Sequence, residues 1–156
     1  MSTAPPSPAT WPDWSGPTEH CMPPQGSAGS AAALDWLEAL GERQGWPTRT
    51  RMALALCADE ALANIALHAR TPAGAPAQRW LSCGPTAAGL ALCIEDDGLP
   101  FDPTTQPSPE LADSLDEMAI GGHGLRLMRH YLHQLLYQRT SERNRLLLEV
   151  AWPQTP

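Results

Sequence analysis

Three side chains that could take part in chemistry recur at four-residue intervals in one predicted helix. The stretch DEALANIALHA, residues 59–69, contains Glu60, Asn64 and His68. Four residues of an α-helix turn through about 400°, so the three side chains form one stripe. Such a stripe is commonly solvated surface, but asparagine gains little in mid-helix unless its side chain has a partner. An amide oxygen one turn from a carboxylate suits a hard cation such as Mg²⁺.

A run of acidic residues ends one of the predicted strands. The stretch CIEDDGLPFDP places Glu95, Asp96 and Asp97 directly before Gly98. A tight turn by itself explains an Asp-Gly pair. The preceding strand is apolar, however, so one acid should point into the interior, where a buried carboxylate needs a hydrogen-bond donor. We single out Asp96, for which the exocyclic amine of a purine would be such a donor.

A glycine-rich sequence opens a further predicted helix. In GGHGLRLM, residues 121–128, three of the first four residues are glycine. Backbone N–H groups at a helix N-terminus can bind anions, and glycine lets a phosphate approach them closely. A plain loop hinge would explain the glycines equally well. Arg126 and Arg129 follow on the helix, where they would contact phosphate or remain solvated.

The elements that must position these residues follow from the hydrophobic pattern. In chain order, the pattern predicts a helix over 30–45, a helix over about 48–69, a hairpin of strands at 78–84 and 89–96, a helix over 125–137 and a strand over 145–152. The polar stretch 103–120 is too long for a turn and is typical of a lid or binding loop. We assign no chemistry to the turn at 141–144. This order predicts an α/β fold, an α+β two-layer sandwich whose mostly antiparallel sheet carries helices on one face.

Length and composition suggest one folded domain behind an N-terminal arm. The 156 residues suit a single domain, and residues 1–29 are crowded with Pro, Ser, Thr and Gly. We therefore divide the chain into an arm over 1–29 and a domain over 30–156. Large apolar rings rarely stay free in water, so Trp11 and Trp14 are expected to dock on the domain.

Charge and residue usage exclude several function classes. A net charge of −7 argues against a nucleic-acid binder, and all ten basic side chains are arginine, which excludes a Walker-type phosphate loop. The four cysteines form no C-x-x-C pair, so neither a zinc site nor a thioredoxin-like motif is expected. The sequence contains no apolar run long enough to span a membrane and no signal-peptide pattern. We expect a cytoplasmic protein without nucleic acid or a membrane as direct partner.

Together, the three stretches resemble the sequence boxes of a known family. EALANIALHA (60–69), DDGLPFD (96–102) and GGHGLRLM (121–128) are similar to the N, G1 and G2 boxes of the GHKL, or Bergerat, ATP-binding fold of histidine-kinase-like ATPases. The HA pair after the N box, PFDP after G1 and the short chain resemble the anti-sigma-factor serine/threonine kinases of bacterial partner-switching systems. The resemblance covers about residues 30–152, and the ordered set is far more specific than any single box.

The resemblance implies a role for each matched position. Asn64 would ligate Mg²⁺ and bridge the phosphates of ATP, and Glu60 would be the general base for an attacking hydroxyl. Asp96 would accept the adenine amino group, and Gly98 would leave room for the ring. The hinge and backbone cradle of an ATP lid over 103–120 would be formed by Gly121, Gly122, His123, Gly124 and Leu125.

The resemblance also implies an activity and partners. Such kinases transfer the γ-phosphoryl group of ATP to a serine of a small antagonist protein of the STAS type, sequester a sigma factor and act as homodimers. Positioning and charge neutralisation carry most of this chemistry, which explains why lysine is dispensable. His68 fits the end of the family's helix and is expected to be structural.

Two departures from the family pattern leave an alternative open. The lid stretch contains four acidic residues and no arginine, and His123 stands where a small or apolar residue is usual. Neutralisation of the γ-phosphate would then fall to Arg126 or to an arginine of a partner. The alternative is a catalytically weak ATP-binding switch that regulates by protein contact alone.

Overall fold

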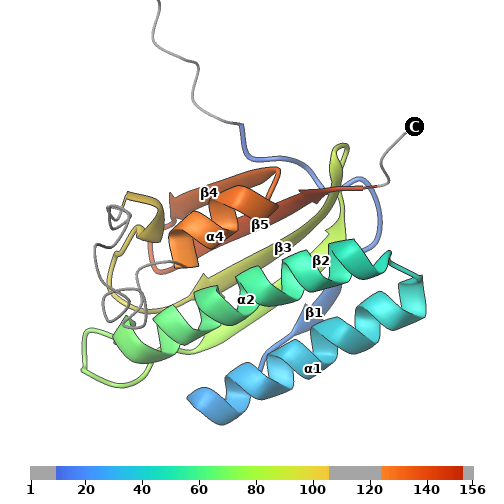
Figure 1. The fold of residues 1–156 in the computed structure, drawn as a ribbon. Coiled ribbons are helices and arrows are strands. Elements are labelled where there is room, and N and C mark those ends of the chain that lie inside the picture. Colours follow the sequence, from blue (N-terminus) through green and yellow to red (C-terminus); the bar gives the residue numbers. More distant parts are fainter. Residues whose placement is uncertain (1–9, 106–123, 153–156) are drawn as a thin grey trace, which may run out of the picture.

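In the described part of the chain, a five-stranded antiparallel sheet covered by three helices forms the core of the protein. The computed structural model describes residues 10–105 and 124–152, which Figure 1 shows in colour. The elements are β1 (Glu19–Cys21), α1 (Ser27–Gln44), α2 (Thr48–His68), β2 (Arg79–Pro85), β3 (Gly89–Asp96), the 3-10 turn η1 (Pro103–Thr105), α4 (Gly124–Tyr131), β4 (Gln134–Arg139) and β5 (Asn144–Ala151). The predicted two-layer fold class is confirmed.

The sheet brings the end of β3 beside the beginning of β5. Its strand order is β1-β2-β3-β5-β4, and every neighbouring pair is antiparallel. The register places Asp96 opposite Arg79 on one side and Asn144 on the other. Asp96 and Asn144, which are 48 positions apart in sequence, therefore lie side by side where β3 ends and β5 begins.

Alternation along the central strands separates the two faces of the sheet. Figure 1 shows the helices lying on one face of the sheet. Leu90, Leu92 and Ile94 of β3 pack with residues of these helices in the main core. Ala91 and Cys93 point to the opposite face, where they form a smaller cluster. This period of two is the expected property of a strand that is buried on both faces.

The third helix is shorter than the sequence predicts. The helix expected over 125–137 ends at Tyr131, and Gln134–Arg139 forms strand β4 instead. Leucines at 135 and 136 fit either a helix or a strand, and pairing with β5 provides backbone hydrogen bonds and a contact between Leu136 and the apolar outer face. Tertiary pairing has overridden the local helical pattern.

Part of the proline-rich N-terminal region belongs to the sheet. β1 pairs with residues 81–83 of β2, and α1 already begins at Ser27, inside the stretch assigned to the arm. Trp11 packs against the outer-face cluster, as expected, and Trp14 forms a β-bridge with Thr86 while remaining 37 % exposed. Residues 1–9 lie outside the described part of the chain.

A buried arginine explains why this region folds onto the domain. The Arg79 side chain is only 1 % exposed and donates hydrogen bonds to the backbone oxygens of Pro24 and Gly26 and to Oγ of Ser30. A buried cation needs such acceptors, because an unpaired one would be costly. The turn before α1 and the first turn of this helix provide them, although no charge pattern in the sequence indicates this interaction.

Within the described residues no helix has the length and apolar character needed to cross a membrane.

Candidate functional site

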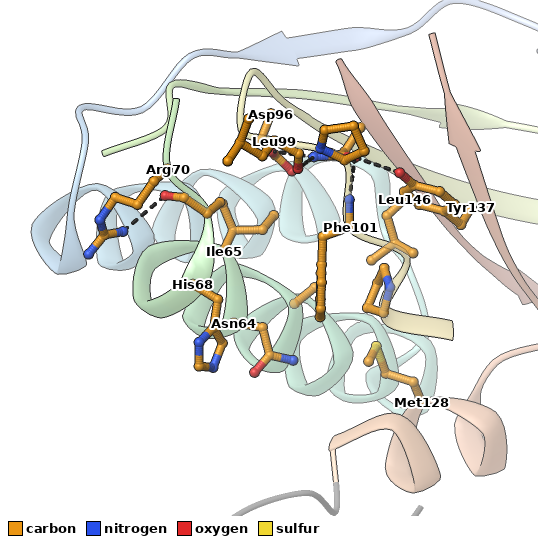
Figure 2. A pocket seen from close by; sticks show the side chains of 15 residues that line it. Asn64, Ile65, His68, Arg70, Asp96, Leu99, Phe101, Met128, Tyr137 and Leu146 are labelled. Carbon is orange, nitrogen blue, oxygen red and sulfur yellow. Dashed lines mark hydrogen bonds between the residues drawn. The ribbon is translucent and has the colours of Figure 1, made fainter. Parts of the chain in front are cut away.

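A pocket of about 220 Å³ opens between the end of α2, the loop after β3, and strands β4 and β5. Figure 2 shows its side chains converging from these elements. Its lining residues are Ala61, Asn64, Ile65, His68, Ala69, Arg70, Asp96, Leu99, Pro100, Phe101, Pro103, Met128, Tyr137, Asn144 and Leu146. Most of the wall is therefore apolar, with a few polar groups at its two ends, which is the usual make-up of a small-molecule site.

The helical stripe predicted from the sequence lies on the pocket side of α2, but its members differ in position. Asn64 is half-buried and lines the pocket, and His68 lines it one turn later while remaining exposed. Figure 2 shows both side chains projecting from the same helix. Glu60 is half-buried but is not one of the lining residues. It lies instead against the first residue of α4, Gly124.

The carboxylate of Asp96 closes the opposite end of the pocket. Its side chain is 5 % exposed, and its Oδ1 accepts hydrogen bonds from the Gly98 N–H at 2.9 Å and from Nδ2 of Asn144 at 3.0 Å. Burial raises the pKa of Asp96 above its ordinary value, and these two donors oppose that rise. No described residue donates to Oδ2, so this oxygen remains available to a ligand.

The sequence reasoning missed the residue that holds this carboxylate. Asn144 was part of a turn to which we assigned no chemistry, yet it is 5 % exposed and lines the pocket. Its Oδ1 accepts from the Phe101 N–H at 3.1 Å and from the Tyr137 hydroxyl. Only the strand register, which pairs residue 144 with Asp96, could have indicated this role.

Gly98 has little room for a side chain. A Cβ atom at this position would lie 2.8 Å from Oδ1 of Asp96 and 3.1 Å from the Cβ of Ala69. Both the Asp96 carboxylate and the end of α2 would have to shift. The glycine expected in the G1 box is therefore required by the packing around Asp96.

The described residues include the G2 box only from Gly124 onward. Gly121, Gly122 and His123 and most of the predicted lid, residues 106–120, lie outside the described residues. Gly124 and Leu125 form the first turn of α4, where Leu125 is 8 % exposed and packs in the main core. If Leu125 contacts a nucleotide, it must do so through its backbone.

The arginines of α4 behave differently from one another. Arg129 donates a hydrogen bond at 2.8 Å to the backbone oxygen of Thr104, which ties α4 to the first residues of the predicted lid. Arg126 is exposed on the same helix. Arg70, which the sequence analysis did not single out, lines the pocket while bonding to the carbonyls at the end of α2.

The residues present fit ATP and are compatible with magnesium. Exposed Leu99 and Phe101 face Ile65, Met128 and Leu146 around the pocket, and these apolar walls suit a planar base. Within the described ranges no three His, Cys, Asp or Glu side chains gather as a metal cluster. A nucleotide-bound Mg²⁺ needs no such cluster, because phosphates and waters supply most of its ligands. Asn64 is the protein group that would complete the set.

The fold and this pocket define an ATPase domain of the histidine kinase-like class. The chain matches the family described as "Histidine kinase-like ATPase domain" over residues 27–150, which is most of its length, and it belongs to that family. The family resemblance inferred from the three boxes is thus confirmed.

A characterised relative narrows the class. The chain is 52 % identical over 116 residues to the serine/threonine-protein kinase BtrW of Bordetella bronchiseptica, and the match covers 74 % of this chain and 81 % of the relative.

Proposed function

We propose that this protein binds Mg-ATP in the pocket between Asn64 and Asp96 and phosphorylates a serine of a small antagonist protein. The sequence predicts an ATP-dependent protein serine/threonine kinase. The similarity to BtrW, which is named a serine/threonine-protein kinase, confirms this prediction. The identity of the acceptor serine, the sequestration of a sigma factor, the homodimer and the cytoplasmic setting are parts of the proposal.

One observation carries the proposal. Asn64 and Asp96, which come from different boxes of the sequence, line the same pocket at opposite ends of an apolar wall. The spacing suits a nucleotide whose base lies near Asp96 and whose phosphates extend toward the helix that bears Asn64. Family membership supports the same orientation.

In this arrangement each residue has a separate task. Asp96 accepts the amino group of adenine, the apolar walls hold the ring, and Asn64 holds the metal-bound phosphates. Glu60, one helical turn from Asn64, accepts the proton of the attacking serine hydroxyl. Removing water from this end of the pocket and aligning the hydroxyl with the γ-phosphorus account for most of the rate in phosphoryl transfer.

The experiment that tests the proposal is phosphoryl transfer to a candidate antagonist. The full chain is incubated with γ-labelled ATP, magnesium and a STAS-type protein of the same organism, with Glu60→Gln as the matched inactive variant. We expect label on a serine of the antagonist with wild type and none with Glu60→Gln. Binding of ATP without any transfer by wild type would remove the kinase proposal.

The acidic lid sequence supports a second candidate, an ATP-dependent switch that acts by contact alone. Four acids and no arginine between residues 103 and 120 give the γ-phosphate no local positive charge. In that case the antagonist would bind in an ATP-dependent manner while the label stayed on the nucleotide.

A further inference from the structure

We propose that Asn144 is a positioning residue that sets the base selectivity of the pocket. It fixes the carboxylate of Asp96 so that one oxygen is occupied and the other faces the nucleotide as a pure acceptor. This inference rests on the proposed function, since it concerns how the same pocket tells one nucleoside triphosphate from another.

The orientation of the Asn144 amide is fixed by the nature of its partners. Oδ1 faces the Phe101 N–H, which can only donate, and Nδ2 faces the Leu99 carbonyl at 2.9 Å, which can only accept. The opposite assignment of the amide would place two donors and two acceptors against each other. Nδ2 must therefore donate to Asp96.

The hydrogen-bonding capacity of Asn144 is fully used inside the protein. Both Nδ2 hydrogens have protein acceptors, and Oδ1 receives the Phe101 N–H and the Tyr137 hydroxyl. The residue is also 5 % exposed. It has no group left for a ligand, so any effect on nucleotide binding must pass through Asp96 or the loop 98–101.

The consequence for Asp96 is a carboxylate that cannot turn. Two donors, the Gly98 N–H and Asn144 Nδ2, hold Oδ1, and burial prevents water from replacing them. Oδ2 is left as an acceptor in a pocket of low polarity, where an unmatched partner is costly. A 6-amino group satisfies this acceptor, a hydrogen at C6 leaves it unpaired, and a 6-oxo group repels it.

The same side chain fixes the loop that forms the wall next to the base. Asn144 bonds to Leu99 and Phe101 of this loop, and Arg139 from the neighbouring strand donates to the Gly98 oxygen at 2.8 Å. Side chains at the end of β4 and at the beginning of β5 thus hold the loop and the Asp96 carboxylate in place together. Replacing Asn144 should loosen both at once.

The test compares ATP with purine riboside 5′-triphosphate, which lacks only the 6-amino group. Dissociation constants of the full chain with magnesium are measured by calorimetry for wild type, Asn144→Ala and Tyr137→Phe. Gln138→Ala is the matched control, because Gln138 is the exposed neighbour of Tyr137 on β4. The ratio of the two constants isolates the amino group from general damage to the pocket.

We expect wild type and Gln138→Ala to prefer ATP by about tenfold or more, the size of one hydrogen bond to a charged acceptor. In Asn144→Ala the preference should fall to about threefold or less, and Tyr137→Phe should give a smaller fall of the same sign. If Asn144→Ala does not fold, Tyr137→Phe decides by the same ratio.

Two results would overturn the inference while leaving the proposed binding of Mg-ATP and the proposed phosphoryl transfer intact. One is a wild-type protein that binds both nucleotides equally, because Asp96 would then not recognise the amino group. The other is an undiminished preference in Asn144→Ala and Tyr137→Phe, which would make Asn144 merely structural. Failure of wild type to bind either nucleotide would refute the proposed function and the inference together.

Discussion

Gly124 leaves the space that the carboxylate of Glu60 occupies. A Cβ atom built on Gly124 would overlap Oε2 and the carboxyl carbon of Glu60, so the two residues are in contact although 64 positions separate them in the sequence. The glycine at the start of α4 therefore contributes to the position of the proposed catalytic base. This is a steric role, distinct from the backbone contact to phosphate that the G2 box implies.

Gly124→Ala should displace Glu60 and slow phosphoryl transfer. Because the obstructing atoms belong to the end of a flexible side chain, the fold should tolerate the methyl group while the carboxylate moves. We expect transfer to the antagonist to fall by about tenfold or more, in line with the loss of well-placed general base catalysis, with ATP affinity within about threefold of wild type. Rapid-quench single-turnover assays and calorimetry measure the two quantities.

The double variant Glu60→Ala/Gly124→Ala is the control for this prediction. If the glycine acts through Glu60, the double variant should be no slower than Glu60→Ala alone. Equal losses from Gly124→Ala in the presence and absence of Glu60 would contradict the steric role.

Substitutions at Asn64 and Glu60 should separate binding from chemistry. Asn64→Ala removes the oxygen proposed to hold the metal and should abolish binding of Mg-ATP, whereas Glu60→Ala should preserve binding and lose transfer. Fluorescent-nucleotide titration with and without magnesium, followed by the transfer assay, gives both readouts. Unchanged ATP affinity in Asn64→Ala would refute the metal assignment.

Asp96→Asn should stabilise the fold at neutral pH at the expense of function. Burial raises the pKa of Asp96 in the folded state above its unfolded value. The stability that protonated Asp96 contributes is present below the unfolded pKa and is lost as pH rises through the folded one. Asparagine retains the acceptor for Gly98 and Asn144 without the buried charge, so its advantage over wild type should grow from pH 3 to pH 7.

Urea denaturation at several pH values measures this difference, and ATP titration measures the accompanying loss of binding. A variant whose stability relative to wild type is the same at pH 3 and pH 7 would show that ionised Asp96 costs the fold nothing. In that event the carboxylate would not be under the desolvation that its burial indicates.

Trp11→Ala should destabilise the domain although Trp11 precedes β1, the first described element. Its ring packs on the outer-face cluster and lies 4.6 Å from the guanidinium carbon of Arg145. Loss of this half-buried ring and of the cation–π contact should lower the free energy of unfolding by about 1 to 3 kcal/mol. Trp14→Ala, at the more exposed ring, should cost less, and equal effects would argue against the docked position of Trp11.

The sequence by itself determined the family, the two-layer fold and the pair of residues at the ends of the pocket. Glu60, Asn64 and His68 share one side of α2 because helical periodicity is a local property, and the β2–β3 hairpin followed from two apolar runs around a Gly/Pro turn. The three boxes indicated the family, and the family match over residues 27–150 bears this out.

Only the tertiary structure decided what depends on pairing between distant segments. The strand register placed Asn144 against Asp96. Pairing with β5 made residues 134–139 a strand and not the end of a helix. Hydrogen bonds from buried Arg79 hold the turn before α1 against the domain. Each outcome rests on satisfying backbone or charged groups across long sequence separations. No local pattern identifies such a partner, because water could satisfy the backbone and charged groups of each segment on its own.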